Sequence, residues 1–203
     1  MNTRTIGFDF DQTLADSQPG ISTCLRVLCE EFYSPKEDHL IDKLSISGLS
    51  LERMLKELFN LSEIEKQKQR FLELYPTLGV PGTKLIPGAR ELINYLAADG
   101  HHLVLISAKS QRNLDLSVEH LGLKFTAVFG GSSGRDKTRV MMENNTYLYI
   151  GDQMSDIEAA NFADAKAVLV SEKPLELDVN QFPHIHFHSL YELHKSIHLL
   201  VKK

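Results

Sequence analysis

Apolar and polar residues follow two different rhythms along this chain. Short apolar runs, too short for helices, occur at the start and throughout the second half, and each is typical of a buried strand. Between them, apolar residues recur every three or four positions, which indicates helices that are buried on one face. This alternation predicts an α/β fold with a doubly wound parallel sheet and right-handed crossovers. The predicted strands cover residues 5–10, 102–107, 126–129, 147–150, 167–170 and 185–187, and the predicted helices lie between Gly88 and Gly100, over 110–121, 136–144 and 154–163, and after Ser189, where Ser189 and Glu192 cap the last helix.

One long segment shows only the helical rhythm. Residues 17 to about 76 are predicted to be wholly helical, with breaks at Ser34-Pro35 and at Tyr75-Pro76. Ser50 is a candidate N-cap, and Ser62 with Glu65 forms a capping-box pattern. We therefore expect residues 17–84 to form an inserted all-helical cap domain, and residues 1–16 and 85–203 to form the α/β core.

Composition and charge narrow the functional classes. The chain has 203 residues, 42% hydrophobic and 24% charged, which excludes low-complexity and disordered proteins. Its net charge of -5 gives no overall attraction to nucleic acid or to an anionic membrane, so we expect neither as a partner. No apolar run approaches the ~18 residues of a transmembrane helix, and we expect a cytoplasmic protein. Cys24 and Cys29 fall on different faces of one helix, which predicts neutral buried thiols.

Acidic residues follow the ends of several predicted strands. Ligands of open parallel sheets bind outside the carboxyl ends of the strands, so these side chains are candidates for a site. Carboxylates that converge there repel one another unless a cation lies among them, and hard oxygen ligands without His or Cys favour Mg²⁺. The candidate residues are Asp9, Asp11, Asp152 and Asp156, together with Ser107 at the end of a strand and Lys137 at the start of a helix.

Such a set suits a phosphate group. Lys137 and Ser107 can receive phosphate oxygens, while Mg²⁺ balances the charge. One carboxylate of the Asp9 and Asp11 pair is then a credible nucleophile that forms an aspartyl-phosphate, and the other can act as general acid and base. We expect a small phosphorylated metabolite as the substrate.

Four short motifs in order resemble those of the haloacid dehalogenase (HAD) superfamily, in its phosphatase branch with a small helical cap. The resemblance spans nearly the whole chain. It implies a Rossmann-like core and phosphoglycolate-like or sugar-phosphate substrates. The motifs are Asp9-Phe10-Asp11-Gln12-Thr13-Leu14, Leu105-Ile106-Ser107, Lys137, and Gly151-Asp152-Gln153-Met154-Ser155-Asp156.

The same resemblance assigns roles. Asp9 is implied as nucleophile, Asp11 as general acid and base, and Thr13, Ser107 and Lys137 as phosphate-binding residues. For Mg²⁺ it implies a side-chain oxygen of Asp9, the backbone carbonyl of Asp11, direct ligation by Asp152 and support from Asp156.

Three positions bear on the strength of this assignment. Gln12 stands where Gly is most usual in the family, so the turn after Asp11 lacks a residue free to take positive φ. Arg135 competes with Lys137 for the role of the third motif, and Lys137 is preferred because it starts a helix near the strand ends. Asp11 argues against dehalogenation, because the family's dehalogenases resemble phosphatases that lack this acid.

Other interpretations stay open. Within the superfamily, a phosphomutase or a phosphonate hydrolase is the alternative enzyme, although no lysine stands out for a Schiff base. Outside catalysis, the chain could be a weak relative that binds phosphate for regulation. The Asp9 and Asp11 pair alone would also fit a solvated turn, and Asp156 alone would fit an acid at a helix N-terminus.

Two further groups of residues are open in the same way. His184, His186 and His188 alternate along a predicted strand and form either a transition-metal patch or, as we favour, the polar edge of the sheet. In the cap, Lys43, Arg53 and the turn Ser47-Gly48-Leu49-Ser50 are candidates to contact a second charge on the substrate.

Overall fold

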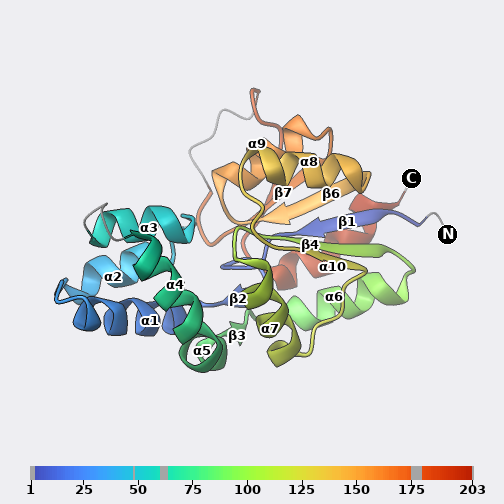
Figure 1. Ribbon diagram of the computed structural model, residues 1–203. Helices are drawn as coiled ribbons and strands as arrows, with labels where there is room; N and C mark the ends of the chain where they lie inside the picture. The colour runs from blue at the N-terminus through green and yellow to red at the C-terminus, as the bar shows by residue number, and fades with distance from the viewer. Residues whose placement is uncertain (1–2, 48, 60–63, 175–179, 203) are drawn as a thin grey trace.

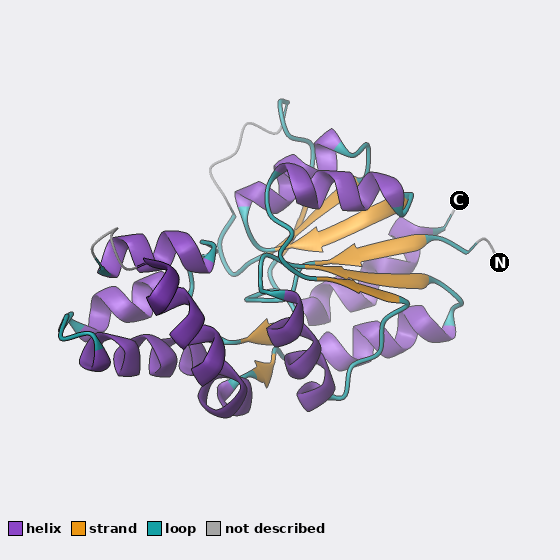
Figure 2. Ribbon diagram, viewed as in Figure 1, coloured by secondary structure: helices purple, strands orange, loops and turns teal. Residues whose placement is uncertain are grey.

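The computed structural model describes residues 3–47, 49–59, 64–174 and 180–202. Its centre is a sheet whose strands run in the order β5-β4-β1-β6-β7-β8, and every neighbouring pair is parallel (Figures 1 and 2). The predicted doubly wound α/β fold is confirmed. The strands are β1 (Thr5–Phe8), β4 (His102–Ile106), β5 (Ala127–Phe129), β6 (Thr146–Gly151), β7 (Lys166–Val170) and β8 (Ile185–Phe187).

Helices bury both faces of this sheet, because its strands are apolar on both sides. Leu103 and Leu105 of β4 pack on one face, whereas Val104 and Ile106 pack on the other. The first face is covered by α6 (Ala89–Ala98), α7 (Gln111–Leu121) and α10 (Leu190–Val201), and the second by α8 (Arg135–Glu143) and α9 (Met154–Phe162).

Gly7 on the central strand makes room for a buried tyrosine. A Cβ at Gly7 would lie 2.6 Å from Cδ2 of Tyr149, so only glycine leaves space for the ring there. The Tyr149 hydroxyl donates a hydrogen bond of 3.0 Å to the carbonyl of Ile106. The tyrosine therefore spans β1 and joins β6 to the end of β4.

The helices of residues 18–82 form a lobe beyond the carboxyl ends of the strands (Figure 1). This helical lobe has its own hydrophobic cluster, which includes the buried, free thiols Cys24 and Cys29. Burial raises the pKa of Cys24 to about 12 and raises that of Cys29, which agrees with the expectation of neutral thiols. The lobe contains α1 (Gln18–Glu31), α2 (Asp38–Ser45), α3 (Leu51–Leu58), α4 (Ile64–Leu74), the π-helical turn η2 (Tyr75–Gly79) and α5 (Val80–Gly82).

Two short strands connect the lobe to the core. β2 (Ala15–Asp16) pairs with β3 (Lys84–Leu85) in an antiparallel ribbon. The predicted boundaries between residues 16 and 17 and between 84 and 85 fall at this ribbon. The division into two domains there stays a prediction.

Several local predictions change. β1 ends at Phe8 rather than at residue 10, so Asp9 belongs to the loop after it. The α-helix α4 ends at Leu74, at the predicted break Tyr75-Pro76, and the chain continues directly into the π-helical turn η2, where Pro76 takes an early position. Ser50 occupies the N-cap position of α3 without a side-chain hydrogen bond, and the Ser62 capping box lies outside the described residues.

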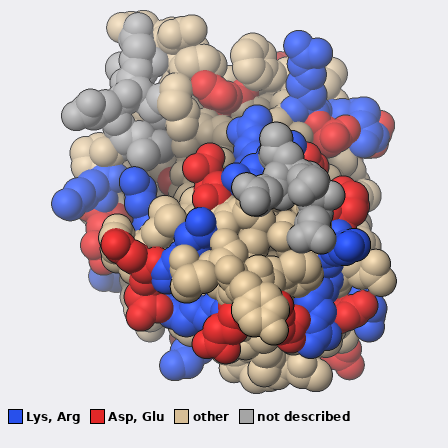
Figure 3. All heavy atoms as spheres, turned by 60° about the vertical axis from the view of Figure 1, so that its left-hand side comes forward, with Lys and Arg blue, Asp and Glu red and all other residues tan. Residues whose placement is uncertain are grey.

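The predicted cap of the last helix is present. The Ser189 hydroxyl caps α10 by accepting the Glu192 N–H at 3.2 Å. Among the described residues, no helix is both long and apolar enough to cross a bilayer. On the face shown in Figure 3, Lys and Arg side chains are interspersed with Asp and Glu.

Candidate active site

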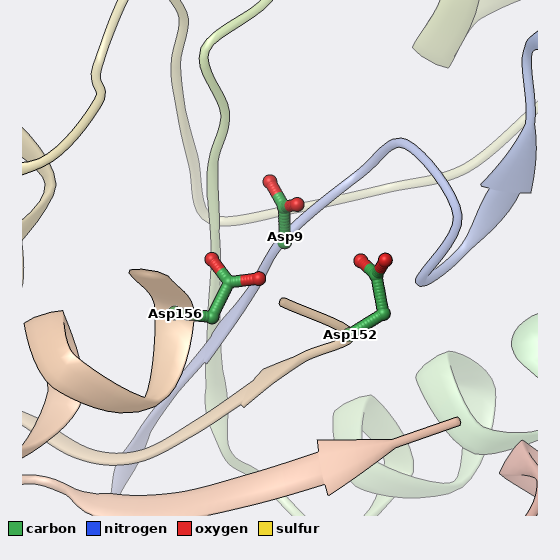
Figure 4. A group of neighbouring side chains, drawn as sticks. All are labelled: Asp9, Asp152 and Asp156. Atoms are coloured by element: carbon green, nitrogen blue, oxygen red, sulfur yellow. The ribbon is translucent and has the colours of Figure 1, made fainter. Parts of the chain in front are cut away.

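Three carboxylates meet at the carboxyl end of the sheet. Asp9 follows β1, Asp152 follows β6, and Asp156 lies in the first turn of α9. Each offers an oxygen atom, and these atoms all lie within 4.8 Å of one another (Figure 4). The neighbouring strands β1 and β6 place the first two side by side, and the Asp9 N–H is fixed by a 2.9 Å hydrogen bond to the carbonyl of Ile150.

Asp156 is held by the start of its own helix. Its Oδ2 accepts the N–H of Gln153 at 3.1 Å, which completes a capping box at the N-terminus of α9. Gly151 lies against the carboxylate, and a Cβ at that position would overlap it. The interpretations of Asp156 as a helix cap and as a site residue therefore hold together.

Lys137 lies among the carboxylates. Its Nζ donates to Oδ1 of Asp156 at 2.6 Å and to Oδ1 of Asp9 at 3.1 Å, and its side chain is only 7% exposed. Arg135, the alternative, is exposed. The start of α8 thus directs the lysine, not the arginine, into the cluster.

The charges of the cluster do not cancel. With every group ionised, three carboxylates and one ammonium carry a formal net charge of -2 in a buried place. Burial, together with Asp156 and Asp152, raises the pKa of Asp9 well above its usual range although Lys137 opposes the rise. Burial and then Asp156 raise the pKa of Asp152 to about 6. The donor set fits a hard divalent cation, which would balance both charges.

Two predicted phosphate-binding residues flank the carboxylates. The Thr13 hydroxyl donates to Oδ1 of Asp152 at 2.8 Å, and this bond uses its one proton. In this arrangement Thr13 positions Asp152, and its contact with phosphate stays a prediction. The Ser107 hydroxyl accepts the N–H of Lys109 at 3.2 Å, so its own proton is not used in that bond.

The turn after Asp11 corrects an expectation about Gln12. Gln12 itself takes the left-handed conformation, with φ of 61°, in place of the usual glycine. Its N–H donates to the carbonyl of Ala15 at 2.8 Å, and its side-chain amide lies 3.4 Å from Oδ1 of Asp16. These contacts hold a conformation that costs about 1–2 kcal/mol for a residue with a Cβ.

Asp11 lies apart from the three-carboxylate group. Its Oδ1 pairs at 3.1 Å with Nζ of Lys109, a residue that the sequence analysis missed. Lys109 also donates to the Tyr75 hydroxyl of the helical lobe at 2.7 Å. The position of Lys109, two residues after Ser107 at the end of β4, was the available signal.

A cavity of about 440 Å³ lies between the carboxylates and the helical lobe. The predicted residues Asp9, Asp11, Ser107, Lys137, Asp152 and Asp156 all line it. On the lobe side the cavity is lined mostly by apolar side chains, Leu49 among them, and also by the polar residues Ser50 and Lys68. Lys43 and Arg53 are exposed and do not line it, and Gly48 lies outside the described residues.

The rings of His186 and His188 near β8 pack edge to face, with centroids 4.7 Å apart. The Nε2 atom of His186 lies 2.8 Å from the carbonyl oxygen of Ser171, and Nδ1 of His188 lies 3.2 Å from that of Glu172. Within the described ranges, the carboxylates of Asp9, Asp152 and Asp156 are the only group of three that could hold a metal. These contacts favour the interpretation of β8 as a polar edge.

Comparison with known proteins identifies the family. Residues 6–170 match the model of the haloacid dehalogenase-like hydrolases. The chain belongs to this family. The predicted family and the predicted enzyme class, a hydrolase, are therefore confirmed.

Similar proteins agree with this haloacid dehalogenase-like assignment. A phosphoglycolate phosphatase of Cereibacter sphaeroides is 26% identical, over 97% of this chain and 96% of its own. A haloacid dehalogenase-like hydrolase of Streptococcus pneumoniae has the same fold, with a TM-score of 0.81 at 18% identity, covering 96% of this chain and 98% of its own. A protein from Clostridium acetobutylicum described as a predicted phosphatase gives a TM-score of 0.80 at 21% identity, covering 98% of this chain and 100% of its own.

Proposed function

We propose that this hydrolase is a Mg²⁺-dependent phosphatase that acts on small phosphomonoesters through an aspartyl-phosphate. The observation that carries the proposal is the cluster of Asp9, Asp152 and Asp156, whose oxygens lie within 4.8 Å, with Lys137 bonded to two of them beside a cavity. The similar protein named phosphoglycolate phosphatase supports a small phosphorylated metabolite as substrate.

Mg²⁺ would be held by Asp9 and Asp152, with Asp156 in support and the backbone carbonyl of Asp11 as a further ligand. The two uncompensated negative charges support this assignment, as does a donor set made only of oxygen. When bound, the ion supplies positive charge that allows a phosphate dianion to approach the carboxylates.

The reaction has two halves. Asp9 attacks phosphorus through a carboxylate oxygen, and the ester P–O bond breaks while Asp11 gives its proton to the leaving oxygen. Asp11, now ionised, takes a proton from water as that water attacks the phosphorus of phospho-Asp9. The second step releases inorganic phosphate and restores Asp9.

Other side chains hold the phosphate group. Lys137 offers an ammonium next to Asp9, and Ser107 offers the hydroxyl proton that its bond with the Lys109 amide does not use. Thr13 contributes by holding Asp152 and by lying at the same edge. Residues 17–84 act as the cap over the cavity, with 1–16 and 85–203 as the catalytic core.

Hydrolysis of p-nitrophenyl phosphate tests the proposal. We expect turnover with MgCl₂, loss of turnover with EDTA, and loss on Asp9→Asn. Asp115→Asn, an exposed acid on α7, is the matched control and should keep the activity. Trapping with beryllium fluoride tests Asp9 directly, because the adduct should be absent in the Asp9→Asn protein.

A substrate panel then separates the remaining alternatives. The panel contains phosphoglycolate, sugar phosphates and a phosphonate. Release of inorganic phosphate from an ester supports the proposal, whereas transfer of the phosphoryl group to another sugar hydroxyl indicates a phosphomutase. No turnover on any member contradicts the enzyme proposal and favours a phosphate-binding relative.

A further inference from the structure

Lys109 connects the two parts of the molecule at the edge of the cavity. Its side chain is 7% exposed, and its ammonium lies 3.1 Å from Oδ1 of Asp11 in the core. The same ammonium donates to the hydroxyl of Tyr75 in η2 at 2.7 Å and lies 4.5 Å from the centre of the Tyr75 ring. A single buried cation is thus shared by the loop after β1 and by the helical lobe.

The partner in the lobe is rigid. Tyr75 is 1% exposed, and its ring stacks on Phe71 with centroids 5.6 Å apart. On its other side the ring lies against Gly79, where a Cβ would overlap it. The position of the Tyr75 hydroxyl therefore depends on the position of the helical lobe.

Lys109 is also fixed through its backbone. Its N–H donates to the Ser107 hydroxyl at 3.2 Å, and its carbonyl accepts the Gly131 N–H at 2.7 Å. Asp11 is less enclosed than Lys109, because its side chain is 28% exposed. In the described part of the molecule, Lys109 is the only cation at ion-pair distance from Asp11.

We propose that Lys109 is a positioning residue for Asp11 and that Tyr75 links this positioning to the seating of the helical lobe. Asp11 in turn acts on the leaving oxygen, so Lys109 affects the reaction without touching the reacting atoms. This inference rests on the proposed function, in which Asp11 is the general acid. The Lys109 ammonium lies within reach of Asp11 in both protonation states: it pairs with the carboxylate, and it can donate to the unprotonated oxygen of the neutral acid. Solvent screens this contact less than an exposed one, because both partners are buried or half-buried.

Leaving-group dependence separates positioning of the acid from a merely structural role. An alkoxide leaves only with a proton, whereas p-nitrophenoxide leaves without much help. Misplacement of Asp11 should therefore lower the rate of hydrolysis most for alkyl esters. The value of kcat/KM is the proper readout, because it includes the first half-reaction and not the later attack of water.

The experiment compares n-propyl phosphate with p-nitrophenyl phosphate. Lys109→Met should lower kcat/KM on the order of 100-fold for the propyl ester, and much less for the aryl ester. Tyr75→Phe, which keeps the ring and removes the hydroxyl, should show the same bias to a smaller extent. The matched control, Lys124→Met, removes an exposed lysine and should change neither ester.

A double variant adds a second criterion. Asp11→Asn should lower the propyl ester rate in the parent protein but add little in Lys109→Met, because both changes remove one function. Equal losses for the two esters, or fully additive losses, would overturn the assignment of Lys109. A parent protein that hydrolyses neither ester would instead contradict the proposed function.

Hydrogen exchange tests the link without any turnover. Lys109→Met should speed amide exchange both in residues 10–15 and in residues 71–79, because it releases the two ends of the same contact. Tyr75→Phe should speed exchange in the same two segments. Unchanged exchange in either segment of the folded Lys109→Met protein overturns the inference.

Discussion

Neutralising Asp152 should stabilise the metal-free protein while removing its response to Mg²⁺. The pKa of Asp152 rises from its ordinary value of 3.8 to about 6, with burial as the first cause and Asp156 as the second. A carboxyl with a raised pKa resists ionisation in the folded state. Its penalty is absent below pH 3.8, grows as the pH rises, and is complete above about pH 6.

The size of the effect follows from that shift. About two pKa units correspond to about 3 kcal/mol at pH 8. Asp152→Asn removes this cost but also loses the hydrogen bond in which Oδ2 accepts from Gln153 at 2.7 Å, worth about 1 kcal/mol. The free energy of unfolding should therefore rise by about 2 kcal/mol in EDTA at pH 8.

Urea unfolding at two pH values measures this change in the free energy of unfolding. The advantage of Asp152→Asn over the parent protein should be present at pH 8 and disappear near pH 4, where Asp152 of the parent takes up a proton. MgCl₂ at pH 8 should stabilise the parent, because ligand binds only the folded state, and should leave the variant almost unchanged. Glu119→Gln, an exposed acid on α7, is the control for charge alone.

Two results would refute the reasoning. In the first, Asp152→Asn is no more stable than the parent in EDTA at pH 8, which would mean that the cluster carries no uncompensated charge. In the second, MgCl₂ stabilises variant and parent equally, which would place the ion elsewhere. Glu119→Gln should be no more stable than the parent in EDTA at pH 8 and should be stabilised by MgCl₂ as much as the parent.

Three further changes test neighbouring parts of the site. Gln12→Gly should raise the free energy of unfolding by about 0.5–1 kcal/mol in urea, because it relieves a left-handed φ of 61° at some cost in chain entropy. Gly151→Ala should lower it by about 2 kcal/mol and weaken thermal stabilisation by MgCl₂, because the new methyl displaces the Asp156 carboxylate. Lys137→Met should lower it by about 4 kcal/mol in EDTA at pH 8 and abolish phosphatase turnover, because buried carboxylates lose their one ammonium; an unfolding midpoint equal to that of the parent would contradict this.

The sequence predicted the parts of the fold that depend on local pattern. Strands buried on both faces give short apolar runs, and parallel strands must bring their carboxyl ends to one edge. The strand ends therefore predict that Asp9 and Asp152 lie together, with Lys137 nearby at the start of its helix. The confirmed sheet follows from the same regularity.

What sequence reasoning missed depends on contacts between distant segments. Lys109 and Tyr75 are 34 residues apart, and their hydrogen bond forms only once the helical lobe is seated on the core. The ribbon of β2 and β3 has two residues in each strand, too few to show a period. At Gln12, residue preference suggested one conformation, and the surrounding backbone imposed another.

The side chain of Asp156 belongs both to the fold and to the candidate site. The same carboxylate accepts a hydrogen bond from the N–H of Gln153 at the start of α9 and another from the ammonium of Lys137. A change at Asp156 therefore alters a helix and a charge cluster together, and its effect on turnover cannot be assigned to chemistry alone. Asp9 begins no helix, so an inert protein made to capture and identify bound metabolites is best made by Asp9→Asn, with Asp156 left in place.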